Sequence, residues 1–180
     1  VSPRDLASAI GRLQEDASSR KAMASAGRAL IDGEGVERVL MHLRGEPLRL
    51  RPVRLQDCRL LWEWANDPTV RAFSFSSDPI PWEQHLQWFQ TKLNDPNVLF
   101  SIAVDPEERP VGQVRYDRNG EGAVISISLD EKFRGRGLGS ALIRLSAREL
   151  FANSDPCEIH AFMKRDNESS ARAFARAGFR

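Results

Sequence analysis

The sequence predicts a protein of the α/β class, of the α+β kind, with a mixed and mostly antiparallel sheet flanked by helices. Two observations support this. From Pro47 onward, helical periodicity and strand-like alternation follow one another along the chain. In addition, three strand-like segments at 98–104, 110–116 and 123–129 are separated only by short turns, which is typical of antiparallel neighbours.

The first 46 residues differ from the rest, because they predict helices and no strand. Ser2, Pro3 and Asp5 form a helix start, with apolar residues at helical spacing after it. This segment has too few large apolar residues to fold alone. Since the chain also begins at Val1 without a Met, we expect a helical extension over 1–46 that is the end of a preceding domain.

The remaining segments are predicted in order. Strand 48–53 alternates apolar and basic residues. Asn66-Asp67-Pro68 ends the helix predicted over 56–65, and Gly178 ends the last predicted helix. The predicted helices are 56–65, 81–93, a helix that ends near 151, and 167–177, and the further strand is 158–163.

Composition excludes several classes of function. With 26 basic and 25 acidic residues among 180, the net charge of +1 gives no general attraction for nucleic acid. We find no apolar run long enough for a membrane span and no signal peptide. Cys58 and Cys157 lie far apart, which suits a cytoplasmic location, and His42, His85 and His160 have no metal-ligand spacing.

The stretch RGRGLGS, Arg134 to Ser140, joins a predicted strand to a predicted helix. A helix N-terminus presents free amides, and glycines let a phosphate approach the backbone. A plain turn with solvated arginines is the alternative. The stretch lacks the lysine of a Walker loop, and its glycine spacing differs from that of a dinucleotide fingerprint.

Two motifs resemble the GNAT acetyltransferases, which bind acetyl-CoA. Arg134-x-x-Gly137-x-Gly139 is similar to the loop signature of the family. Asn167-x-x-Ser170, followed by Phe174 and Gly178-Phe179, is similar to its later Asn-x-x-Ser…Tyr…Gly-Phe segment. The resemblance covers residues 47–180 and implies a GNAT domain. The family normally adds one or two strands after Gly-Phe, so the resemblance also implies an incomplete C-terminus and an exposed sheet edge, open to pairing or to a dimer.

The resemblance implies how acetyl-CoA is held. The glycine loop would bind the pyrophosphate, while strands 123–129 and 157–163 would splay to admit the pantetheine arm. The implied cofactor-binding residues are Ile127, Leu129, Arg134, Gly135, Arg136, Gly137, Leu138, Gly139, Ser140, Asn167, Ser170 and Phe174.

The catalytic groups are less clear, because two family features are absent. Phe174 stands where a proton-donating tyrosine is usual, and no glutamate lies on the strand before the loop. The substitutes that we consider are Tyr116, the only tyrosine of the chain, His160 and Glu83 with its neighbour His85.

The acceptor is expected beside an aromatic and polar segment that contains the proposed substrate-binding residues Asn66, Arg71, Phe75 and Trp82. Similar segments occur in family branches that acetylate ribosomal-protein N-termini or the amino-sugar nucleotides of pseudaminic acid synthesis. The first 46 residues resemble the end of nucleotide-sugar hydrolases and glycosyltransferases. This resemblance favours a nucleotide-linked 4-amino-sugar as the small-molecule partner. N-terminal protein acetylation, a CoA-binding module without activity and, least of all, an RNA-contacting protein remain as alternatives.

Overall fold

The computed structural model describes residues 16–19, 21–23, 48–120, 122–153 and 158–180. The chain divides into two compact units, Val1–Arg44 and Gly45–Arg180. In the first unit, residues 17–19 and 21–23 are helical. The other helices predicted before residue 47 lie outside the described residues, as does Cys157.

The second unit is built on one five-stranded sheet with the order β1-β2-β3-β4-β5. Strands β1 to β4 pair antiparallel, whereas β4 and β5 pair parallel. The predicted fold class, a mixed and mostly antiparallel sheet, is therefore confirmed. The strands are β1 (Arg49–Pro52), β2 (Val98–Val104), β3 (Pro110–Asn119), β4 (Gly122–Leu129) and β5 (Glu158–Ala161).

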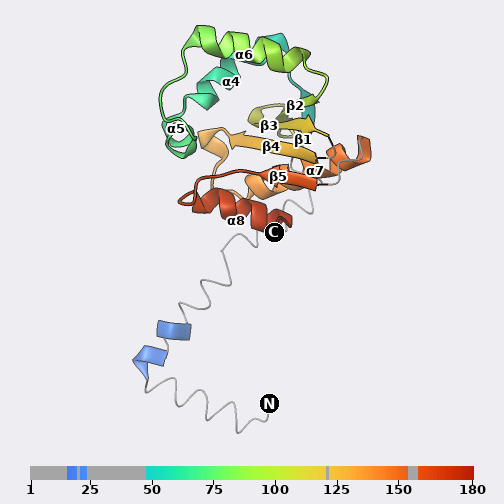
Figure 1. The fold of residues 1–180 in the computed structure, drawn as a ribbon. Helices are drawn as coiled ribbons and strands as arrows, with labels where there is room; N and C mark the ends of the chain where they lie inside the picture. The colour runs from blue at the N-terminus through green and yellow to red at the C-terminus, as the bar shows by residue number, and fades with distance from the viewer. Residues whose placement is uncertain (1–15, 20, 24–47, 121, 154–157) are drawn as a thin grey trace. The chain divides into compact units, whose positions relative to one another are not determined.

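Helices cover both faces of this sheet (Figure 1). On one face lie α4 (Cys58–Ala65) and α6 (Trp82–Asn94), and on the other lie α7 (Leu138–Asn153) and α8 (Glu168–Ala177). The connection between α4 and α6 contains a short helix, α5 (Pro68–Phe73). Two single turns of 3-10 helix, Leu55–Asp57 and Glu131–Phe133, precede α4 and the glycine loop.

The core under α4 and α6 is aromatic. Trp64, Phe89, Phe100 and Ile102 are buried there together. His85 is only 2% exposed, and its ring lies against Trp82, Trp88 and Phe89. Burial lowers the pKa of His85, and its Nε2 lies 3.2 Å from the Cys58 carbonyl oxygen. His85 is thus a core residue, and its burial does not favour the proton-transfer role considered for it.

Most element predictions agree with the structure to within two residues, and three of the differences matter for the site. Strand β3 continues to Asn119, β5 already ends at Ala161, and α5 is an addition. The predicted helix stop at Gly178 is confirmed, because Gly178 caps α8 in the left-handed conformation with φ 102°. Among the described helices, none has both the length and the apolarity needed to cross a bilayer.

Candidate functional site

Strands β4 and β5 separate part of the way along the sheet. Their parallel pairing runs from Gly122 with Glu158 to Ile125 with Ala161, where β5 ends. Strand β4 continues to Leu129, so residues 126–129 have β3 on one side and no strand partner on the other. The pairing of β4 with β5 therefore ends next to Ile127 and Leu129, the residues for which the resemblance implies contact with the pantetheine arm.

The open edge of β4 presents backbone groups. In an antiparallel pair, alternate residues exchange hydrogen bonds with the partner strand. Asp130 N–H donates to the Val111 carbonyl (2.9 Å), and this register makes Ser126 and Ser128 the residues bonded to β3. The N–H and C=O of Ile127 and Leu129 consequently point away from β3. An extended ligand can hydrogen-bond there like an added strand.

The glycine loop follows this edge. Gly135 and Gly137 both have φ 75°, which side chains with a Cβ rarely adopt. Helix α7 begins at Leu138, and its first backbone hydrogen bond runs from Ala141 N–H to the Gly137 carbonyl. The amides of Leu138, Gly139 and Ser140 have no acceptor within the helix and lie at its positive end. The loop thus offers free amides and a favourable dipole to an anion.

Cationic side chains lie beside the loop. Lys132 and Arg136 are exposed and form no ion pair with the described residues. The Arg136 guanidinium lies 5.8 Å from the centre of the Phe133 ring. These three residues also line an open hollow of about 370 Å³ with Arg109, Pro110 and Asp130.

Arg134 has a different environment from the one that its motif suggests. Its Nη1 lies 3.0 Å from Asp67 Oδ1, and its Nε donates to the Leu129 carbonyl at 3.0 Å. Burial alone would raise the pKa of Asp67, but hydrogen bonds from Val70 N–H and Arg134 hold it below its ordinary value. Asp67 is also the N-cap of α5, since it accepts from Val70 N–H at 3.0 Å. Arg134 therefore joins the glycine loop to α5.

The other end of α5 is joined to the segment after β5. Lys164 Nζ donates to the Ala72 carbonyl at 2.9 Å. Helix α5 is thus bonded on one side to Arg134, which follows β4, and on the other to Lys164, which follows β5. This arrangement places α5 beside the opening between the strands.

Three of the four proposed substrate-binding residues hold the connection between α4 and α6 in place. The Asn66 side chain accepts from Ile80 N–H (2.7 Å) and donates to the Ile80 carbonyl (3.1 Å). The Arg71 guanidinium donates within its own loop, to Ser74 Oγ and two carbonyls, and Trp82 packs edge-on against Trp62. Phe75 differs, because it is 78% exposed next to α5.

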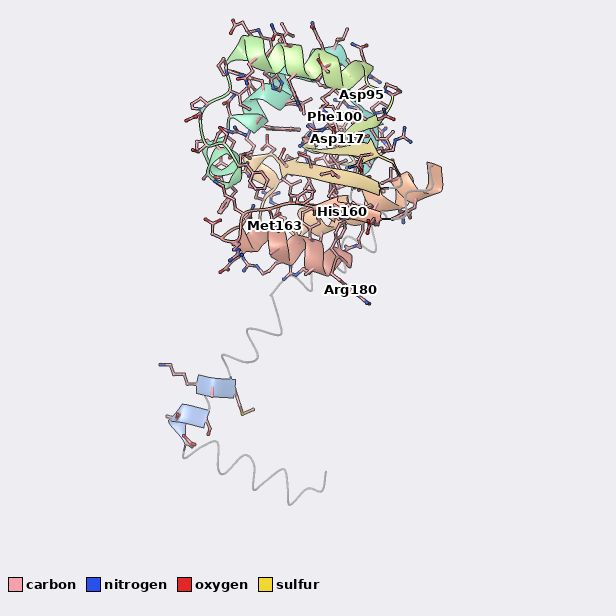
Figure 2. The ribbon with its side chains drawn as sticks, in the orientation of Figure 1. Asp95, Phe100, Asp117, His160, Met163 and Arg180 are labelled. Atoms are coloured by element: carbon pink, nitrogen blue, oxygen red, sulfur yellow. The ribbon has the colours of Figure 1, made fainter. Side chains whose placement is uncertain are left out.

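The structure does not bring the three proposed catalytic residues together. Tyr116 is 3% exposed, and its hydroxyl lies 2.9 Å from Ser146 Oγ on α7. Glu83 is exposed in the first turn of α6. His160 lies on the edge strand β5 and pairs with Glu158 at 3.0 Å. Figure 2 shows His160 and Met163 on the β5 side of the sheet, whereas Phe100 and Asp117 lie under α6.

In the second motif, the residues have clear local contacts. Asn167 is the N-cap of α8, since its side chain accepts from Ser170 N–H at 3.1 Å. Phe174 is 6% exposed and packs edge-on against Phe179, with ring centres 4.9 Å apart. A buried phenyl ring supplies no proton, so the described geometry of Phe174 is that of a packing residue.

Sequence reasoning missed the bonds of Asp67 and Lys164. The Asp67-Pro68 pair is a helix-start signal, an N-cap followed by proline at the first helical position, and it could have predicted α5. The partners Arg134 and Ala72 could not have been predicted, because they lie 67 and 92 residues away in the sequence.

The family model described as "Acetyltransferase (GNAT) domain" matches residues 47–180. An uncharacterized protein of Methanocaldococcus jannaschii is 25% identical over 134 residues, which is 73% of this chain. The match spans only 28% of the length of that curated relative.

Three solved structures illustrate the shared fold. A spermidine N-acetyltransferase from Vibrio cholerae in complex with CoA and spermine has a TM-score of 0.68 at 17% identity, covering 74% of this chain and 81% of that one. A domain from Methanocaldococcus jannaschii has 0.67 at 24%, covering 74% and 88%. AAC(6')-Ib in complex with paromomycin and acetyl-CoA has 0.66 at 20%, covering 75% and 84%.

Proposed function

Since this chain belongs to the GNAT acetyltransferase family, we propose that it binds acetyl-CoA between β4 and β5 and transfers the acetyl group to a primary amine. The observation that carries the proposal is the open edge of β4 at 126–129, directly followed by a glycine loop with free amides. The glycine loop suits the pyrophosphate of acetyl-CoA, and the open edge of β4 suits its pantetheine arm.

The residues present fit acetyl-CoA. The positive φ of Gly135 and Gly137 and the free amides at the start of α7 suit a pyrophosphate, and Arg136 and Lys132 add nearby positive charge. The outward-facing N–H and C=O of Ile127 suit an amide-containing arm. Leu129 offers mainly its N–H, because Arg134 already uses its carbonyl.

Bound acetyl-CoA would supply the activated acetyl thioester. The protein's part is to hold the loop and the arm, to bring the amine beside the free edge, and to exclude competing water. A backbone N–H at this edge can stabilise charge on the thioester oxygen. The amine must lose a proton before it attacks, and for that step Glu83 and His160 remain the exposed candidates.

For the acceptor we propose a nucleotide-linked amino-sugar. The support is the resemblance of segment 62–75 to amino-sugar acetyltransferases and of the first 46 residues to nucleotide-sugar enzymes. The exposed ring of Phe75 beside α5 is compatible with stacking on a base or a sugar. Polyamines and aminoglycosides, the amines named with the structural neighbours, are the competing acceptors to test.

The test is a thiol-release assay with acetyl-CoA and four amines: a nucleotide-linked amino-sugar, spermidine, an aminoglycoside and a peptide with a free N-terminus. We expect amine-dependent release with the highest kcat/KM for the amino-sugar. A higher kcat/KM for another amine would overturn the proposed acceptor but would still support acetyl transfer. CoA binding without thiol release in the presence of any of the four amines would favour a CoA-binding module without activity.

The loop assignment has its own variant. Valine at position 137 would be strained at φ 75° by roughly 1–2 kcal/mol, so we expect Gly137→Val to weaken CoA binding at least tenfold. Gly120→Val is the matched control, because Gly120 has φ 61° in the β3–β4 turn with open space around it. Equal CoA affinity of the two variants would contradict the loop assignment.

A further inference from the structure

Gln113 carries a buried polar atom that the fold does not use. Four buried side-chain atoms in the described part of the chain have no hydrogen-bond partner, and Gln113 Oε1 is the one acceptor among them. The other three are guanidinium nitrogens of Arg71, Arg118 and Arg134. Leaving such an acceptor unpaired destabilises the fold, because the oxygen gives up its hydrogen bonds with water and gains none in the protein. A buried carbonyl oxygen of this kind therefore calls for a physical explanation.

The other end of the same amide contacts the open segment of β4. Gln113 Nε2 donates to Ser128 Oγ at 3.3 Å, and the two residues are paired across β3 and β4. Ser128 lies in 126–129, the part of β4 without a neighbour on its other side. A hydroxyl can donate or accept, so the Gln113 amide keeps one buried polar atom unpaired in either orientation.

Both side chains lie on the face of the sheet that α4 and α6 cover. Side chains alternate along a strand, and Arg115, two residues from Gln113, lies 5.0 Å from the centre of the Trp88 ring on α6. Tyr116 points to the opposite face, toward Ser146 on α7. Trp64 Nε1 donates to Asp130 Oδ2 at 2.9 Å, which places the end of α4 over the end of β4, two residues beyond Ser128.

We propose that the Gln113 carboxamide and the Ser128 hydroxyl form the acceptor-amine site, with Gln113 Oε1 accepting a hydrogen bond from the reacting nitrogen. This inference rests on the proposed acetyl transfer. An acceptor bound over the free edge of β4 on the α4 face would lie next to Ser128, with Gln113 as the partner of Ser128 on β3. Because both are neutral, they orient an amine without the charge of a carboxylate, which would favour its unreactive ammonium form.

The chemical step then balances simply. The amine nitrogen forms the new C–N bond as the C–S bond of the thioester breaks, the electron pair leaves with sulfur, and one amine proton is lost to water or base. Gln113 and Ser128 take no proton in this step. They are positioning residues that hold the nitrogen through an N–H bond, so that its lone pair faces the thioester.

The experiment compares Gln113→Met with wild type at saturating acetyl-CoA. Methionine has a similar size and shape but cannot accept the amine hydrogen bond. A lost hydrogen bond of about 1.4 kcal/mol corresponds to a factor of ten, so we expect a tenfold higher KM for the acceptor, with unchanged CoA affinity. The melting temperature should stay the same or rise, because an unpaired buried oxygen is removed. Ser128→Ala should raise the same KM.

Gln90→Met on the exposed surface of α6 is the matched control and should behave like wild type. An unchanged KM in Gln113→Met, or a lower melting temperature with wild-type kinetics, would overturn the inference and leave acetyl transfer standing. A wild-type protein that binds no CoA and transfers no acetyl group would instead overturn the proposed function, and this inference with it.

Discussion

The hydroxyl of Tyr116 is held inside the domain, where it is 3% exposed and 2.9 Å from Ser146 Oγ. Burial raises the pKa of Tyr116 to about 12, although the bond with Ser146 opposes part of that shift. A phenol with this pKa stays protonated across the neutral range, and its bond to α7 occupies it. We therefore expect Tyr116 to stabilise the contact between β3 and α7 and to take no part in proton transfer.

The test is Tyr116→Phe. Because the hydroxyl is buried and bonded to Ser146, away from any substrate, kcat/KM should stay within about twofold of wild type. Its dependence on pH between 6 and 9 should also be unchanged. The free energy of unfolding in urea should fall by about 1 kcal/mol, the usual worth of a buried hydrogen bond. A tenfold fall in kcat/KM with unchanged stability would place the hydroxyl at the reacting amine instead.

At the scale of elements, α5 couples the two halves of the candidate site. The Asp67–Arg134 pair is partly buried, with the two side chains 16% and 27% exposed. Asp67→Asn retains a side-chain oxygen for the cap of α5 but removes the charge that Arg134 pairs with. We expect Asp67→Asn and Arg134→Gln each to raise the KM for acceptor and the Kd for CoA severalfold, because each releases α5 from the loop.

A double-mutant cycle in urea tests the same pair. The coupling energy of Asp67 and Arg134 should be about 1 kcal/mol, so the double variant should be little worse than either single one. The exposed pair Arg172 and Glu168 on α8 is the control and should give a coupling near zero. Equal coupling in both cycles would contradict the role of α5.

The sequence predicts elements better than contacts between them. Strand β1 and the stop of α8 follow from local signals, namely the alternation of apolar and basic residues along the strand and the glycine that follows the last helical turn. The glycine loop could also be predicted from the sequence, because the spacing of its glycines is itself what lets an anion approach the backbone. The roles of Arg134 and Gln113 were not, since each depends on a partner on another strand or helix. A motif names Arg134, but only the fold shows that Asp67 already pairs with it.

Across the described part of the second unit, four carboxylates with lowered pKa link stability to pH. Arg51 donates to both oxygens of Asp57 at 2.8 Å, and these hydrogen bonds lower the pKa of Asp57 although burial opposes them. Burial would likewise raise the pKa of Asp67, Asp105 and Asp117. Arginine partners together with backbone N–H groups hold the pKa of Asp67 and Asp105 below its ordinary value, and Lys92 and Arg115 do so for Asp117. Each carboxylate therefore binds its proton more weakly in the folded than in the unfolded state.

The sign of the effect follows from this difference. Their stabilisation is fully present above the unfolded pKa of about 3.9 and is lost as pH falls through the lower folded values. His85 adds an effect of the same sign at higher pH. Burial lowers the pKa of His85, so the unfolded chain takes up a proton there first, from about pH 6.5 downward.

We therefore expect the free energy of unfolding to be highest near neutral pH, to decline slightly below pH 6.5 and to fall steeply below pH 4. Each carboxylate contributes at most about 1.4 kcal/mol per pH unit. Urea unfolding at pH 7, 5, 4 and 3 measures the curve.

Asp57→Asn should lower the free energy of unfolding at pH 7 and flatten its fall below pH 4, because an asparagine at position 57 has no carboxylate to be protonated. Asp166→Asn, at an exposed carboxylate without a bond to the described residues, should leave the curve unchanged. A curve of the same steepness in Asp57→Asn would show that this buried pair does not set the acid limit of the fold.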